Sequence, residues 1–145
     1  MHYSAEVKNK LRFMREVMGL LPGGLMSLEG NLRKACFDDR LLASRKPIGK
    51  LKRDTFWPRL DFLVIRLEPT ALDDILTGVA AVGLEKEDDG ILHVYMERNG
   101  AIEFAAHDWY DGCAVIGHSI PVALLEKLQL RGVVDSFRPE PGISP

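Results

Sequence analysis

The feature that most constrains the fold of this chain is a β-hairpin pattern centred on Asn99 and Gly100, a residue pair that favours a tight reversal between two strands. Apolar and polar residues alternate on both sides of this pair. A two-residue loop would pair Met96 with Glu103 and mix apolar with polar residues on each face. A three-residue loop with Gly100 in a left-handed bulge would pair Met96 with Ile102 and give one apolar face. We therefore predict an antiparallel hairpin with the three-residue loop.

Further strands and helices are expected from residue 60 onward. Leu60 to Leu67 is an almost continuous apolar run, which is typical of a strand inside a sheet. Thr70, with Asp73 three residues later, predicts the capped start of a helix that ends at Gly83. The remaining expected elements are a strand over 113–117, a helix from Ser119 to Gly132 and a strand over 133–137. The predicted order is strand, helix, three strands, helix, strand.

The first 59 residues carry weaker signals. Ser4 is a good N-cap, and the apolar residues after it recur at helical spacing, which predicts an amphipathic first helix. Those apolar residues are Val7, Leu11, Met14, Val17 and Leu21. Residues 25–43 show only a weak helical pattern through Leu32, Ala35 and Cys36 and receive no firm assignment. Residues 44–59 have no periodicity, which predicts a long loop of the kind that is usually functional or disordered.

Length and composition indicate one globular domain. The chain has 145 residues, of which 46% are hydrophobic and 28% charged. We predict a single α+β domain over residues 1–138, with a mostly antiparallel sheet of about five strands and the helices packed on one face, plus the N-terminal amphipathic helix. Within it, 1–59 would be a basic helical and loop part and 60–138 the sheet and helix core, followed by a flexible tail over 139–145.

No apolar run reaches the about 20 residues that a membrane span needs, and the N-terminus lacks the zones of a signal peptide. The sequence therefore predicts a cytoplasmic protein without a membrane partner. The two cysteines are too few for a disulfide framework, and they do not form a pair with zinc-ligand spacing.

Charge is divided unequally along the chain. Residues 1–70 contain 14 Lys and Arg against 8 Asp and Glu, whereas residues 71–145 contain 5 against 13. The basic excess is densest between Arg40 and Arg59, where Asp54 is the single acid. The candidate binding residues of this stretch are Arg45, Lys46, Lys50, Lys52, Arg53, Trp57 and Arg59. Cations beside aromatic residues fit single-stranded nucleic acid or a protein with an acidic face; alternatively, Trp57 belongs to the core.

An acidic aromatic turn follows the hairpin and is a second candidate binding site. It consists of Asp108, Trp109, Tyr110 and Asp111. The two carboxylates would repel nucleic acid, so this turn suits contact with a protein partner.

The polar face of the hairpin is a third candidate site. His93, Tyr95, Glu103 and His107 would project on the same side, with His118 on the next strand. Imidazole and carboxylate are ligands of first-row metals, so one alternative function is a metal-assisted hydrolase at this face. The predicted register places the two hairpin histidines diagonally rather than opposite each other, and we predict no metal site.

No complete catalytic pattern is present. Gly117-His118-Ser119 resembles the nucleophile elbow of the α/β-hydrolase family, but no histidine follows Ser119 as that family requires. Cys113 lies outside any nucleophile signature, and the glycines match no phosphate or dinucleotide motif, so we expect no catalytic residue and no cofactor. The sequence favours a small non-catalytic protein that binds a protein partner as an inhibitor, immunity protein or adaptor. The alternatives are nucleic-acid binding through residues 45–59 and the hydrolase above, and a homo-oligomer is compatible with each.

Overall fold

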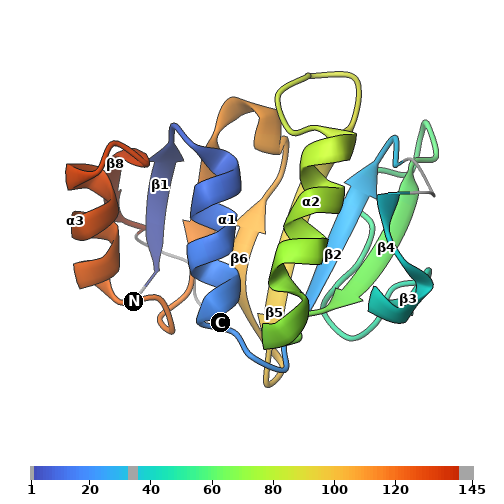
Figure 1. The fold of residues 1–145 in the computed structure, drawn as a ribbon. Coiled ribbons are helices and arrows are strands. Elements are labelled where there is room, and N and C mark those ends of the chain that lie inside the picture. Colours follow the sequence, from blue (N-terminus) through green and yellow to red (C-terminus); the bar gives the residue numbers. More distant parts are fainter. Residues whose placement is uncertain (1, 33–35, 141–145) are drawn as a thin grey trace.

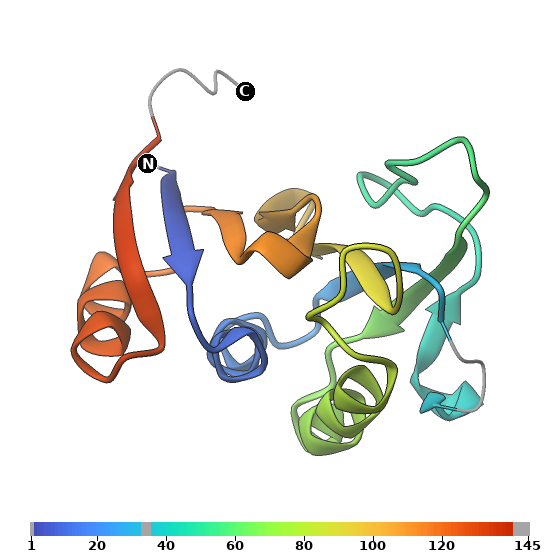
Figure 2. The same ribbon diagram turned by 90° about the horizontal axis from the view of Figure 1, so that it is seen from above.

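The computed structural model describes residues 2–32 and 36–140, and in this part of the chain an eight-stranded antiparallel sheet carries three α-helices on one side (Figure 1, Figure 2). The strands are β1 (Tyr3–Val7), β2 (Leu25–Gly30), β3 (Leu42–Ser44), β4 (Asp61–Arg66), β5 (Ile91–Arg98), β6 (Ala101–Ala106), β7 (Cys113–Ile116) and β8 (Val134–Pro139). The helices are α1 (Lys10–Gly19), α2 (Leu72–Val82) and α3 (Val122–Leu130). The strand order across the sheet is β3-β4-β2-β5-β6-β7-β1-β8.

The predicted α+β class, the antiparallel sheet and the element order after residue 60 are confirmed. β4 lies inside the sheet between β3 and β2, as its continuous apolar run predicts. α2 buries Ile75, Leu76 and Val79 and ends at Gly83, which has a φ of +100°. The predicted Thr70 cap is wrong, because Thr70 lies in a 3₁₀ turn before the helix and Ala71 is the N-cap residue.

The predicted N-terminal helix begins too early in the chain. Residues from Tyr3 to Val7 form β1, which pairs with β7 on one side and β8 on the other. Asn9 is the N-cap of α1, and its side chain accepts a hydrogen bond from the backbone N–H of Arg12 at 3.1 Å. Of the predicted apolar stripe, Leu11, Met14 and Val17 are therefore helical. Val7 enters the core from β1, and Leu21 enters it after the end of α1.

The weak helical pattern over residues 25–43 is also misleading. Residues from Leu25 to Gly30 form β2, which lies in the sheet between β4 and β5. Ser27 and Glu29 alternate with apolar residues along this strand, and both polar side chains are buried. Ala35 lies outside the described residues. The sheet therefore has eight described strands rather than five, because three of them belong to the part expected to be helix and loop.

The hairpin closes with the two-residue loop, so the predicted register is wrong. Asn99 and Gly100 both have positive φ, at 52° and 77°, and Arg98 pairs with Ala101. A β-bulge then shifts the register, so that Met96 pairs with Phe104 rather than with Glu103. The bulge restores one apolar face without the three-residue loop, an arrangement that a regular ladder does not provide.

Two apolar layers lie on opposite faces of the sheet. The larger one packs under the three helices, and the smaller one consists of Leu51, Phe62 and Val64 with partly buried neighbours. Figure 2 shows the loop that precedes β4 on the side of the sheet opposite the helices, near β4, β2 and β5, so this part of the face is covered. The predicted tail over 139–145 begins too early, because Pro139 is the last residue of β8; residues 141–145 lie outside the described residues. Within the described residues, no helix is both long and apolar enough to cross a membrane.

Candidate functional site

Residues 45–59, called the basic loop below, have almost no regular structure, as predicted. An isolated bridge between Ile48 and Leu51 is the exception. Leu51 is fully buried against the smaller apolar cluster, which fixes the middle of the loop on the sheet. The loop therefore has a defined position over β2 and β5 rather than a free path.

A buried carboxylate on β2 holds the second half of the loop. The Glu29 side chain is 2% exposed. Its Oε1 accepts the backbone N–H of Asp54 at 2.7 Å and its Oε2 accepts that of Thr55 at 3.3 Å. Hydrogen bonds to a carboxylate are stronger than those between neutral groups, so Glu29 anchors the backbone of these two residues.

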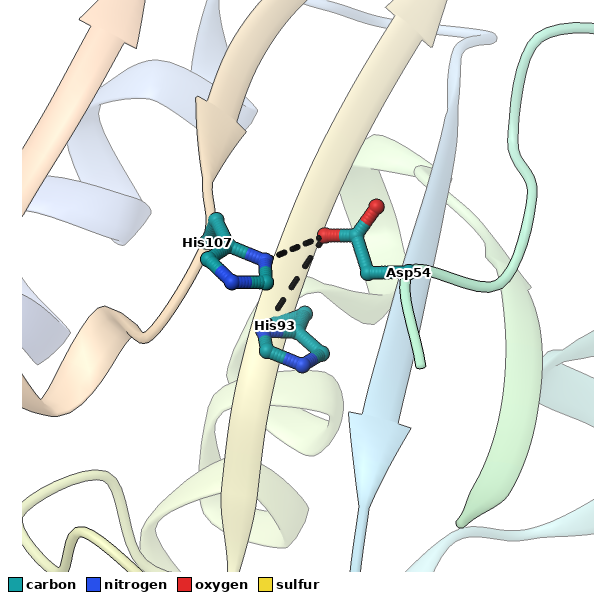
Figure 3. Close-up of side chains that lie close together, drawn as sticks. All are labelled: Asp54, His93 and His107. Carbon is teal, nitrogen blue, oxygen red and sulfur yellow. Dashed lines mark hydrogen bonds and ion pairs between the residues drawn. The ribbon is translucent and has the colours of Figure 1, made fainter. Parts of the chain in front are cut away.

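The Asp54 side chain meets two histidines from the hairpin (Figure 3). Its Oδ2 accepts the Nδ1–H of His107 at 3.0 Å and also accepts the hydroxyl of Tyr95. The His93 ring stacks on the His107 ring with centroids 4.3 Å apart and planes at 4°. After the bulge Val94 pairs with Ala106, so the next residues along the two strands, His93 and His107, lie side by side at the end of β6.

The hydrogen bonds of His93 define its protonation state. Its Nδ1 lies 3.0 Å from the backbone N–H of Asp108 and can only accept from it. The ring proton is therefore on Nε2, which donates to the Thr55 hydroxyl at 3.0 Å. This tautomer is the reverse of the one that a catalytic base needs toward a hydroxyl nucleophile, so His93 and Thr55 are not a nucleophile–base pair.

The environment shifts the pKa values of the cluster in different directions. Burial, followed by the charge of His107, lowers the pKa of His93. The hydrogen bond to Asp54 is the main cause that raises the pKa of His107. Burial and the hydrogen bond to Asp54 raise the pKa of Tyr95. Compared with free imidazoles, the cluster therefore favours the neutral form of His93 and the protonated form of His107.

The donor atoms of Asp54, His93 and His107 lie within 4.8 Å of one another, and this donor set suits a first-row transition metal. The ring planes argue against such a site. Imidazole lone pairs lie in the plane of the ring, so two parallel stacked rings cannot direct them at one ion. The Nδ1 lone pair of His93 is also engaged by Asp108. In this arrangement the cluster holds the basic loop, and its ring geometry is unsuited to binding one metal ion.

The predicted polar site is only partly brought together. His93, Tyr95 and His107 surround Asp54, whereas Glu103 and His118 lie near each other, with Oε1 and Nδ1 3.9 Å apart. Sequence reasoning missed Asp54 as a member of the site. Its signal was its position as the single acid in a strongly basic stretch.

The two tryptophans have opposite environments, and the predicted role of Trp109 as a contact residue is wrong. Trp109 is 0% exposed, stacks edge-on against Phe104 at 5.3 Å and donates its indole N–H to the Met14 sulfur at 3.4 Å. Its side chain therefore belongs to the core and is not available to a partner, although Asp111 in the same turn is exposed. Trp57, for which a core position was the alternative, is 87% exposed.

No family model, curated protein or solved structure matches this chain.

We expect the free energy of unfolding to depend on pH through both histidines, in opposite directions. His107 has a raised pKa, so its contribution is complete below its ordinary value of 6.5 and is lost as the pH rises through the folded pKa. His93 has a lowered pKa, so its contribution is complete above 6.5 and is lost as the pH falls toward the folded pKa.

Urea denaturation of the wild type and His107→Gln between about pH 5 and pH 8.5 tests this expectation. The difference in free energy between the two proteins should shrink as the pH rises above the ordinary histidine value. A difference that stays constant over this range would contradict the proposed hydrogen bond between Asp54 and a protonated His107.

Proposed function

We propose that this protein works by binding another macromolecule through Phe56 and Trp57, called the aromatic tip below. The observation that carries the proposal is their exposure: the two adjacent side chains are 90% and 87% exposed. Large aromatic residues placed together in solvent are a common mark of an interaction site, because burial against a partner releases the water around them.

The aromatic tip directly follows the anchored part of the loop. Asp54 and Thr55 are fixed through their backbone and side chains by Glu29, Tyr95 and the two histidines. A contact surface that is held in place before binding loses less conformational entropy when the partner arrives. The polar cluster therefore serves the interaction by positioning the tip.

The charge around the tip favours a protein partner with an acidic surface. Lys52, Arg53 and Arg59 flank the tip, and the carboxylate of Asp54 is occupied inside the cluster. Tryptophan and arginine are the residues that contribute most to protein interfaces. The whole chain has a net charge of −2, which is unlike the strongly basic surface of most nucleic-acid-binding domains. Within this proposal the protein is an inhibitor, immunity protein or adaptor.

Single-stranded nucleic acid is the second candidate ligand. Exposed aromatic rings beside lysine and arginine side chains can stack on bases while the cations contact phosphates. The adjacency of the tip to Lys52, Arg53 and Arg59 is the specific observation in its favour.

Capture of the tagged protein's partners from a lysate of its source, with and without nuclease, tests both candidates. The test variant is the double substitution Phe56→Ser with Trp57→Ser. The matched control is Leu130→Ser, because Leu130 is 90% exposed on α3 and does not lie in the basic loop. The proposal is supported if the wild type and the control capture a protein that stays bound after nuclease treatment and the double variant does not capture it.

Titration of labelled oligo-dT and oligo-U separates the second candidate from the first. If the protein binds nucleic acid through the tip, its affinity for these oligonucleotides should fall steeply as the salt concentration rises and should be lost in the double variant. If the double variant captures the same molecules as the wild type in every arm, the aromatic tip is not the contact surface.

A further inference from the structure

We propose that a pocket beside the basic loop binds a small organic phosphate. The pocket has a volume of about 510 Å³ and lies where the end of β2 meets the start of β4. Arg45, Arg53 and Arg59 line it together with Asp61 and an apolar wall. The apolar wall consists of Leu32, Leu60, Phe62 and Leu63. Three arginines therefore line one cavity of this size.

The cations of the pocket are incompletely paired by the protein itself. Among the described residues, Arg53 and Arg59 have no carboxylate partner at ion-pair distance, and Arg45 pairs with Asp39 at 3.5 Å. Asp61 is the acid of the pocket, and its Oδ2 accepts the backbone N–H of Leu32 at 3.1 Å. The pocket thus keeps an excess of positive charge that an anionic ligand would neutralise.

Arg53 is already held in position for such a ligand. Its Nη1 donates to the backbone carbonyl of Leu60 at 2.5 Å, and its guanidinium carbon lies 5.2 Å from the centre of the Phe62 ring. A guanidinium group has five N–H donors, so these contacts orient the group without using its full capacity. Holding the side chain before binding reduces the entropy lost when a ligand is captured.

The chemistry of the pocket indicates the class of ligand. Guanidinium groups bind phosphate through paired hydrogen bonds, and a phosphate monoester carries nearly two negative charges that match several arginines. The volume lies in the range of small-molecule sites, and the leucines and Phe62 offer an apolar surface to the organic part. A phosphate monoester the size of a mononucleotide fits these features. The aromatic tip does not line this pocket, so this inference and the proposed function can fail independently.

Calorimetric titration with adenosine monophosphate, inorganic phosphate and adenosine tests the inference. We expect saturable binding of adenosine monophosphate, weaker binding of inorganic phosphate and no binding of uncharged adenosine. Arg59→Ala should weaken adenosine monophosphate binding at least about tenfold, since a hydrogen bond to a charged group is lost. Arg59 is exposed, so this substitution leaves the core intact.

Lys46→Ala is the matched control, because it removes one positive charge from the same loop outside the pocket. If it weakens binding as much as Arg59→Ala, the attraction is a general effect of loop charge and the pocket is not a site. The absence of saturable binding of both phosphate probes at about 1 mM would also overturn the inference. Phe56→Ser with Trp57→Ser should leave adenosine monophosphate binding unchanged.

Discussion

Replacement of Trp109 by alanine is expected to lower the free energy of unfolding by about 3–5 kcal/mol, the range for truncating a buried aromatic side chain. Trp109 is fully buried between Phe104 and Met14, so the substitution leaves a large cavity where α1 and the hairpin meet. Urea denaturation followed by far-UV circular dichroism measures the change. If the variant is too unstable to purify, Trp109→Phe provides a milder truncation at the same position.

Trp57→Ala is the matched control for this prediction. It removes the same side chain from a position that is 87% exposed, and we expect a change of less than about 0.5 kcal/mol. Equal loss of stability in the two alanine variants would show that the environments assigned to the tryptophans are wrong. The pair also separates stability from binding, since the proposed function needs Trp57 and not Trp109.

The second half of the fold follows from local sequence signals. β4 is recognisable from its apolar run, α2 from its apolar stripe and Gly83, and the hairpin from Asn99 and Gly100. The register of the hairpin was not predictable in the same way. A β-bulge satisfies the apolar pattern as well as a longer loop does, and only the neighbouring strand β7 and the packing of Phe104 distinguish the two.

The strands within the first 59 residues could not be predicted, because they depend on partners that are distant along the chain. β1 pairs with β7 and β8, more than 100 residues away along the chain. Val7 by chance continues the helical spacing of Leu11 and Met14, so the apolar pattern predicts one continuous helix where the structure has a strand and then a helix. In β2, Ser27 and Glu29 are polar but buried, which removes the apolar signal expected of a strand inside a sheet.

The candidate site was also only partly predictable from the sequence, because one of its residues comes from a distant loop. His93, Tyr95 and His107 follow from strand alternation, because they share one face of the hairpin. Asp54 joins them from a loop without periodicity, and only the path of that loop across the sheet brings its carboxylate to His107. Glu29 anchors the backbone of the loop at Asp54 and Thr55, and this anchoring positions the Asp54 carboxylate beside His107.

Replacement of Glu29 by alanine is expected to have the second-largest effect, a loss of about 1.5–3 kcal/mol in the free energy of unfolding. The buried carboxylate accepts two backbone N–H groups of the loop, and alanine leaves both without that acceptor. Glu29→Gln keeps one carbonyl oxygen at the same place and should lose less. The loss should be concentrated in the loop, so amide hydrogen exchange at Asp54 and Thr55 should accelerate more than exchange in β4.

Glu97→Ala is the control, because Glu97 holds the same loop through a single hydrogen bond from the backbone N–H of Lys50 at 3.1 Å and is only partly buried. We expect a loss of less than about 1 kcal/mol from this variant. If the backbone amides of Asp54 and Thr55 exchange at the same rate in Glu29→Ala as in the wild type, Glu29 does not anchor the loop.

If Glu29 does anchor the loop, Glu29→Ala should also weaken partner binding through Phe56 and Trp57 without altering either side chain, because the tip would no longer be held in place before binding.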